Sequence, residues 1–189
     1  ISKKVHSSYL LKAQKGQFTG CLAPFGYRKD PEDKNHLLID EETAPIVRRL
    51  FAWALEGHGP NYIRRRLEEE KIPCPTYWNR VRGLRNVSTK WEKKDPVNGR
   101  YIWDFTVIKD ILMNPVYTGA IASQKKEYRF KIGTIGEKKP EEWIVVENQH
   151  EPLVDRKTFD IVQRKLKSRQ RPRQTGEISL FAGLIKCGE

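Results

Sequence analysis

Basic side chains that could hold phosphate groups gather in three segments of this sequence. One covers residues 1–29 and contains no acidic residue, a second covers residues 77–103, and a third covers residues 156–173. Lys and Arg bind nucleic acids by displacing the counterions that surround the phosphates. Over 189 residues, 36 Lys and Arg face 24 Asp and Glu, a formal net charge of +12. This balance predicts a polyanionic partner, such as a nucleic acid or an anionic membrane.

Residues for catalysis or metal binding form no comparable pattern. The four histidines are scattered over different predicted elements, and no zinc-protease, phosphate-loop or nucleophile-elbow motif occurs. Two adjacent acid pairs, Glu41 with Glu42 and Glu141 with Glu142, could hold a metal ion. Acids at the starts of helices and strands more often act as caps or face solvent. We therefore predict no catalytic residue and no metal ion in this chain.

The lengths of the apolar stretches and the spacing of the cysteines indicate the cellular compartment of the protein. No stretch reaches the roughly 18 apolar residues of a membrane span, and Ile1 begins no signal-peptide pattern, which excludes a membrane protein. The three cysteines, Cys21, Cys74 and Cys187, are too widely spaced for a disulfide framework, which favours a reducing cytosol. Because the chain does not start with Met, we expect it to be a piece of a longer protein.

Helical periodicity dominates the first two thirds of the chain. Apolar residues recur at helical spacing in residues 1–16, 40–56, 60–71 and 105–113, and Asp104 precedes the last of these as a cap. Between the first two helices, residues 17–29 lack a period and predict an extended arm, which Phe18, Phe25 and Tyr27 could pin to a core. Residues 77–103 are expected to form a long basic loop. The helices predicted at residues 40–56, 60–71 and 105–113 then make a small all-α core.

Beyond Gly119 the pattern changes to strands. Tyr128, Phe130 and Ile132 alternate with polar residues, the sequence EEWIVVEN supplies a second strand, and the two predict a hairpin. Asp155 can cap a further helix. The predicted fold is α+β, a small helix-turn-helix-like DNA-binding domain followed by a β-hairpin and helix of a truncated second domain. The predicted divisions are 1–29, 30–121 and 122–189.

DNA contacts are predicted on three of these elements. In a helix-turn-helix the last helix enters the major groove, and arms of irregular basic chain enter the minor groove. Simpler roles stay open for these elements. Trp103 could pack in the core and Lys109 could be an ordinary solvated lysine. The arm could be a linker between domains, and the loop could be solvated chain without a DNA contact. The predicted DNA-binding residues are Lys12, Lys15, Gln17, Thr19, Arg28, Arg80, Arg82, Arg85, Tyr101, Thr106 and Lys109.

Several blocks of this sequence resemble one family. In order they are GQFTGCLAPFGYRKD, LLIDEETAPIVRRLFAWALEG, IRRRLEEEKIPCP and TVIKDILMNPVYTG. Over residues 16–121 they resemble the recombinase domain of the large serine recombinases, the integrases and transposon resolvases of bacterial mobile elements. Two later blocks, EEWIVVENQHEPLVDRKTFDIVQRKL and LFAGLIKCG, are similar to the start of that family's C-terminal domain, ahead of its zinc ribbon.

The resemblance implies that DNA cleavage and DNA recognition are carried by different parts of the protein. The catalytic serine, which becomes linked to a 5′ phosphate, would lie in a missing N-terminal part. Residues 1–16 would end the long helix that leaves it, residues 17–29 would be the minor-groove arm, and residues 105–113 the recognition helix. Cys187 would be the first zinc ligand, with zinc expected only in the full-length protein, a dimer or tetramer on DNA in the bacterial cytoplasm. The connection of residues 73–103 is longer than usual in the family. The prediction that its arginines contact DNA therefore comes from their charge alone and not from the resemblance.

Together these observations predict sequence-specific binding of double-stranded DNA. The chain would be a fragment of a large serine site-specific recombinase that integrates or excises a mobile element. An RNA-binding or ribosome-associated protein is the alternative that the charge permits, although the exposed aromatic sheet motif of single-strand readers is lacking. A metal-dependent nuclease using the scattered carboxylates is a third reading.

Overall fold

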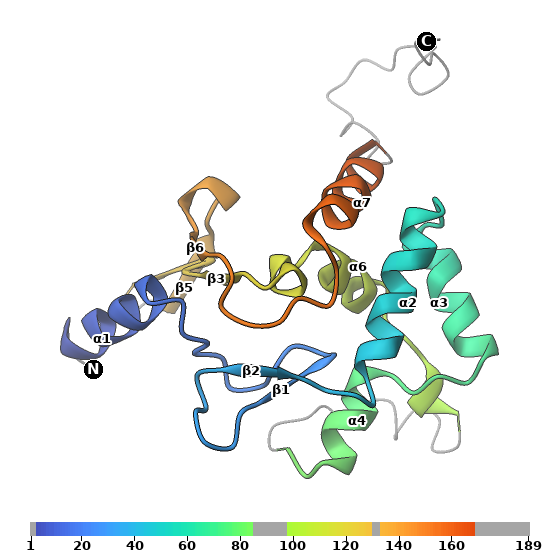
Figure 1. Ribbon diagram of the computed structural model, residues 1–189, viewed down its shortest axis with the longest axis horizontal. Coiled ribbons are helices and arrows are strands. Elements are labelled where there is room, and N and C mark those ends of the chain that lie inside the picture. The colour runs from blue at the N-terminus through green and yellow to red at the C-terminus, as the bar shows by residue number, and fades with distance from the viewer. Residues whose placement is uncertain (1–2, 85–97, 130–132, 169–189) are drawn as a thin grey trace.

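A computed structural model describes residues 3–84, 98–129 and 133–168 (Figure 1). Its helices are α1 (Lys3–Gln14), α2 (Ala44–Leu55), α3 (Pro60–Glu69), α4 (Pro75–Val81), α6 (Phe105–Met113) and α7 (Arg156–Ser168), with short 3-10 turns at Gly99–Tyr101, Pro115–Thr118 and Pro140–Glu142. Its strands are β1 (Tyr27–Lys29), β2 (Leu37–Ile39), β3 (Ile121–Ser123), β4 (Lys126–Arg129), β5 (Gly133–Glu137) and β6 (Ile144–Val146). More of the described residues thus lie in helices than in strands, and the strands pair two by two.

The long predicted helices are confirmed, and their ends show why they form. The Asp104 carboxylate accepts a hydrogen bond from the Thr106 backbone N at 2.8 Å and so caps α6. Asp155 caps α7 in the same way, through the Thr158 backbone N at 2.9 Å. Pro45 lies in the first turn of α2, where its missing N–H has no helical partner to lose.

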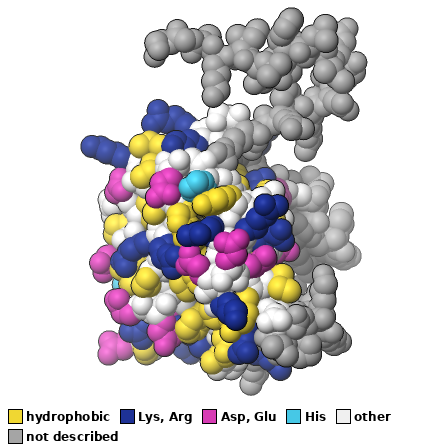
Figure 2. Space-filling model, turned by 90° about the vertical axis from the view of Figure 1, so that its right-hand side faces the viewer, with side chains coloured by type: hydrophobic (Ala, Val, Ile, Leu, Met, Phe, Trp, Pro, Cys, Tyr) yellow, Lys and Arg dark blue, Asp and Glu magenta, His cyan; other side chains and the backbone are white. Residues whose placement is uncertain are grey.

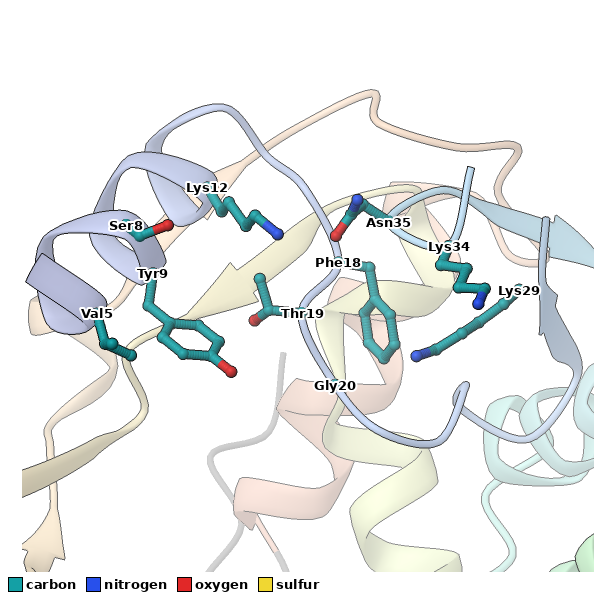
Figure 3. A pocket seen from close by; sticks show the side chains of 10 residues that line it. All are labelled: Val5, Ser8, Tyr9, Lys12, Phe18, Thr19, Gly20, Lys29, Lys34 and Asn35. Atoms are coloured by element: carbon teal, nitrogen blue, oxygen red, sulfur yellow. The ribbon is translucent and has the colours of Figure 1, made fainter. Parts of the chain in front are cut away.

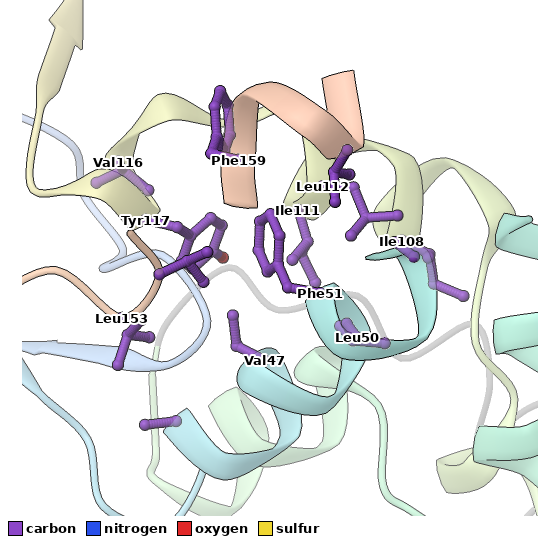
Figure 4. Packing of buried hydrophobic residues seen from close by; sticks show 14 of the residues in the cluster. Val47, Leu50, Phe51, Ile108, Ile111, Leu112, Val116, Tyr117, Leu153 and Phe159 are labelled. Carbon is purple, nitrogen blue, oxygen red and sulfur yellow. The ribbon is translucent and has the colours of Figure 1, made fainter. Parts of the chain in front are cut away.

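The core forms where α2, α6 and α7 meet (Figure 4). Phe51 of α2 lies at its centre, with its ring 5.7 Å from that of Tyr117 and 6.2 Å from that of Phe159. Burying each such side chain contributes roughly 1.5–3 kcal/mol. The buried side chains of the three helices are Ala44, Val47, Leu50, Phe51, Ala54, Ile108, Ile111, Leu112, Phe159 and Val162. Because α7 helps to close this core, the hydrophobic cluster continues across the predicted division at residues 121 and 122, and that division stays a prediction.

The predicted arm is packed on the core through Phe18, Phe25 and Tyr27, and its end is a strand rather than irregular chain. Its last residues form β1, which pairs antiparallel with β2 and places Tyr27 opposite Ile39. The Tyr27 hydroxyl donates to the Glu151 carbonyl at 2.9 Å, and its ring is buried. Gly26 has φ +93°, and a Cβ there would lie 2.8 Å from Val47 Cγ2. The expected pinning by Tyr27 and its neighbours is therefore confirmed, while the expected irregularity ends at Tyr27.

The predicted pairing of the C-terminal strands is wrong. Residues 126–129 pair with residues 133–137, and residues 144–146 pair instead with residues 121–123. An alternating pattern identifies a strand but not its partner. Here β5 is the next strand after β4 in the sequence and pairs with it, which leaves β6 for β3. Phe130 and Ile132 of the predicted strand lie outside the described residues.

The expected long loop at residues 77–103 is also partly wrong. Helix α4 reaches into it as far as Val81, and Pro75 occupies the first turn of that helix, as proline often does. At the other end Trp103 is only 1% exposed, and its Nε1 donates to the Ile72 carbonyl at 2.8 Å. Trp103 is thus a core residue. No helix in the described ranges is long and apolar enough to cross a bilayer.

Candidate nucleic-acid interface

The predicted recognition helix α6 buries one face and exposes the other. Ile108, Ile111 and Leu112 are buried, whereas Thr106 in the first turn is exposed. The Thr106 hydroxyl donates to the Asp104 carboxylate, which fixes its side chain at the helix start. Lys109 is only half-buried rather than fully outward. Thr106 is therefore displayed as expected, and Lys109 lies at the edge of the packed face.

Two apolar side chains beside Thr106 were missed by the sequence reasoning. Ile102 is 44% exposed and Phe105 is 41% exposed. Neither residue belongs to the apolar positions of α6 that face the core. Their apolar character outside that pattern could have identified them in the sequence as exposed contact residues. In a major groove, such side chains can contact the methyl group of thymine. The start of α6 therefore exposes the apolar side chain of Phe105 beside the Thr106 hydroxyl, and Ile102 is exposed three residues before the helix begins.

Two of the three consecutive arginines of α3, Arg64 and Arg66, face carboxylates. Arg64 lies 3.8 Å from Glu68, and Arg66 lies 3.4 Å from Glu70. Arg49 of α2 also pairs with Glu70. Figure 2 views the side of the molecule on which α3 lies in Figure 1 and shows basic and acidic side chains interleaved. On α3 the charges of Arg64 and Arg66 are therefore compensated by nearby carboxylates.

Arg82 follows α4 and was predicted to contact DNA. Its guanidinium instead donates to the Asp40 carboxylate at 2.6 Å and to the Glu42 carboxylate at 2.7 Å. Burial alone would raise the pKa of Asp40, but the hydrogen bonds from Arg82 and Thr43 outweigh this cost and hold that pKa below its usual value. Arg82 therefore ties α4 to the start of α2.

The other residues predicted around the connection have varied settings. Arg80 is exposed on α4. Tyr101 is half-buried, and the Arg100 guanidinium lies 5.2 Å from the centre of its ring. Arg85 lies outside the described residues, as does Cys187.

Helix α1, the arm and the β1–β2 turn together surround a pocket of about 320 Å³ (Figure 3). Its lining residues are Val5, Ser8, Tyr9, Lys12, Phe18, Thr19, Gly20, Lys29, Lys34 and Asn35. Of the predicted DNA contacts, Lys12 and Thr19 line this pocket, whereas Lys15, Gln17 and Arg28 do not. Lys29 belongs to the predicted minor-groove arm, but sequence reasoning missed Lys34 and Asn35, since only the hairpin fold brings them to α1.

A short set of backbone contacts seats α1 beside the arm. Helix α1 ends at Gln14. Two residues later Gly16 has a left-handed φ of +69°, and a Cβ there would lie 2.4 Å from the Gln149 side chain. The Gln17 backbone N donates to the Lys12 carbonyl, and the Phe18 backbone N donates to the Asn35 carbonyl at 2.8 Å. Glycine at position 16 therefore permits both the turn and the close approach of residue 149.

Known proteins are similar to this chain in sequence or in fold. Residues 41–169 match the family model described as Recombinase. The uncharacterized protein YefB of Bacillus subtilis (strain 168) is 36% identical over 87 residues, which cover 45% of this chain and 29% of that protein.

Two solved structures are similar in fold at 15% identity. One concerns sequence requirements of the Listeria innocua prophage attP site; its TM-score is 0.56, over 89% of this chain and 53% of that chain. The other is a crystal structure of an LSR–DNA complex; its TM-score is 0.55, over 96% of this chain and 44% of that chain. The chain thus spans about half of these structures and less than a third of YefB, and the predicted fold class is confirmed. The family match runs past residue 121, where the sequence resemblance to the recombinase domain stopped, and the chain belongs to the Recombinase family.

Proposed function

We propose that this chain binds one half of a double-stranded recombination site as the DNA-binding part of a large serine site-specific recombinase. One observation carries the proposal: a chain of this fold occurs in an LSR–DNA complex, and here the same fold displays the exposed start of α6 and a lysine-lined pocket beside the arm. The start of α6 would read base edges, while the arm and α1 would follow the backbone.

Strand cleavage and assembly belong to the parent protein in this proposal. The cutting serine would be supplied by a catalytic segment outside this chain, and the described residues would position the DNA for it. Zinc binding through Cys187, and assembly as a dimer or tetramer on DNA, are proposed for the longer protein. The chain alone needs no cofactor to bind DNA in this scheme.

Salt-dependent binding to duplex DNA tests the proposal. Fluorescence anisotropy with the purified chain should show affinity falling about 10³- to 10⁵-fold between 50 and 200 mM salt if some 6–10 phosphates are neutralised. Selection from a random duplex library should then return a consensus sequence. A structured RNA of equal length serves as competitor. A flat salt response, or preference for the RNA, would overturn the proposal.

A further inference from the structure

Three lysines from separate parts of the chain converge on the pocket beside the arm. Lys12 comes from α1, Lys29 from β1 and Lys34 from the turn that follows, and all three line the same cavity (Figure 3). The structure records no ion pair for any of them within the described ranges. Three ammonium groups without such a partner raise the electrostatic potential of the pocket and favour an anion there.

Acidic residues of the same turn are bound within the turn. Asp33 accepts hydrogen bonds from the backbone N and the side-chain Nδ2 of Asn35, at 2.9 and 3.2 Å. Asp30 accepts from the Glu32 backbone N at 2.9 Å and lies 3.7 Å from His36 Nδ1. The hydrogen bonds from Asn35, and to a smaller extent the charge of Lys12, lower the pKa of Asp33. No recorded ion pair joins Asp30 or Asp33 to a pocket lysine within the described residues, so the three lysines leave the pocket with an excess of positive charge.

The rest of the lining suits a phosphate group. Ser8 and Thr19 supply hydroxyl groups that can donate hydrogen bonds to its oxygens. Phe18 forms an apolar wall, with Lys29 Nζ 5.6 Å from the centre of its ring. Apolar walls exclude water and strengthen the attraction between fixed charges and an anion. At about 320 Å³ the pocket lies at the small end of ligand sites, near roughly 300 Å³.

We propose that this pocket binds one backbone phosphate of the duplex, held by Lys29 and Lys34 of the β1–β2 hairpin together with Lys12 of α1. The inference rests on the proposed function and adds the hairpin as a DNA contact beside the arm and α6. Because Lys12 lies on α1 and the other two lysines lie on the β1–β2 hairpin, the bound phosphate bridges the helix and the hairpin. Bound DNA thereby fixes the direction in which α1 leaves the recombinase domain.

Lysine-to-glutamine variants measure this contact. In Lys34→Gln and Lys29→Gln, duplex affinity should fall about tenfold each. The slope of log affinity against log salt should become shallower by about 0.9 for each lysine that contacts a phosphate. Lys139→Gln, an exposed lysine that does not line the pocket, is the matched control and should change neither quantity. Circular dichroism checks that every variant folds.

A scan of neutral methylphosphonate linkages identifies the phosphate itself. Neutralising one or two positions should weaken binding of the unmodified protein, and that loss should disappear in Lys34→Gln while losses elsewhere persist. Unchanged losses at every position in Lys34→Gln would overturn the pocket assignment and leave DNA binding intact. Absence of duplex binding by the unmodified protein would instead overturn the proposed function.

Nuclear magnetic resonance separates the DNA backbone from free phosphate. The amides of Thr19 and Asn35 should shift when the duplex is added and stay unchanged with inorganic phosphate at the same ionic strength. Equal shifts with inorganic phosphate alone would show a general anion site and overturn the assignment to DNA.

Discussion

Helix α3 and the pocket beside α1 are both rich in basic residues, yet they differ in what surrounds the charge. On α3, Arg64 and Arg66 lie within 4 Å of glutamates one turn away. Around the pocket, Lys29 and Lys34 have no recorded ion pair within the described residues. Exposed ion pairs contribute little stability, but they do cancel the field that would attract a polyanion. The comparison teaches that the count of basic residues in a segment says less about DNA binding than the placement of the acids.

Reversing charge in the two regions should give the largest contrast. The double change Lys12→Glu with Lys34→Glu should weaken duplex binding about 100-fold or more, because two phosphate attractions become repulsions. Arg66→Gln on α3 should leave affinity within about twofold, since its charge is already compensated. Anisotropy titrations at one fixed salt concentration measure both. Equal losses in the two variants would break the comparison.

Arg82 extends the comparison to an arginine whose partner is buried. Arg82→Gln leaves the Asp40 carboxylate, with a side chain 8% exposed, without its cation. Removing one partner of a buried pair is costly, although the 31% exposure of the Arg82 side chain moderates the loss to about 2 kcal/mol of unfolding free energy. Urea unfolding measures it, and Asp40→Asn in a double-mutant cycle isolates the pair. A cycle that shows no coupling would contradict this role.

Gly16 tests whether the pocket needs α1 in place. Gly16→Ala meets the Gln149 side chain and a left-handed φ, so α1 should leave its seat and duplex affinity should fall about tenfold as Lys12 is displaced. Gly57→Ala is the matched control because its φ is also positive, at +98°, and nothing lies within 4 Å of the added Cβ. Hydrogen exchange in α1 should rise only in the first variant. Protected α1 amides in Gly16→Ala would contradict this prediction.

The smallest expected effect is a dependence of stability on pH at His150. Burial lowers the pKa of His150, despite the hydrogen bond between its Nε2 and the Val116 carbonyl at 2.8 Å. The unfolded chain therefore binds the proton more readily, so the contribution of His150 is complete above about pH 6.5 and is lost as pH falls through its folded pKa. Thermal unfolding between pH 7 and 5 measures this loss. His150→Gln should flatten the dependence, and an unchanged slope would exclude His150 as its source.

Sequence alone was sufficient for elements set by local pattern. Helix α6 follows from its apolar spacing and from Asp104, which caps it as expected. The pairing of Arg82 with Asp40 joins residues 42 positions apart, and no local pattern records such a contact. The pocket likewise depends on the hairpin, which folds Lys34 back toward α1. Periodicity reveals which face of an element is buried, whereas the partner across that face is set by the tertiary fold.

The packing of α7 on α2 has a practical consequence for dissecting this protein. A shortened version ending near residue 121 would retain every helix of the predicted helix-turn-helix, yet it would leave Phe51 without the ring of Phe159 and turn part of the interior toward water. A shortened version that keeps this packing therefore has to include α7, which ends at Ser168, one residue before the end of the recombinase match at residue 169.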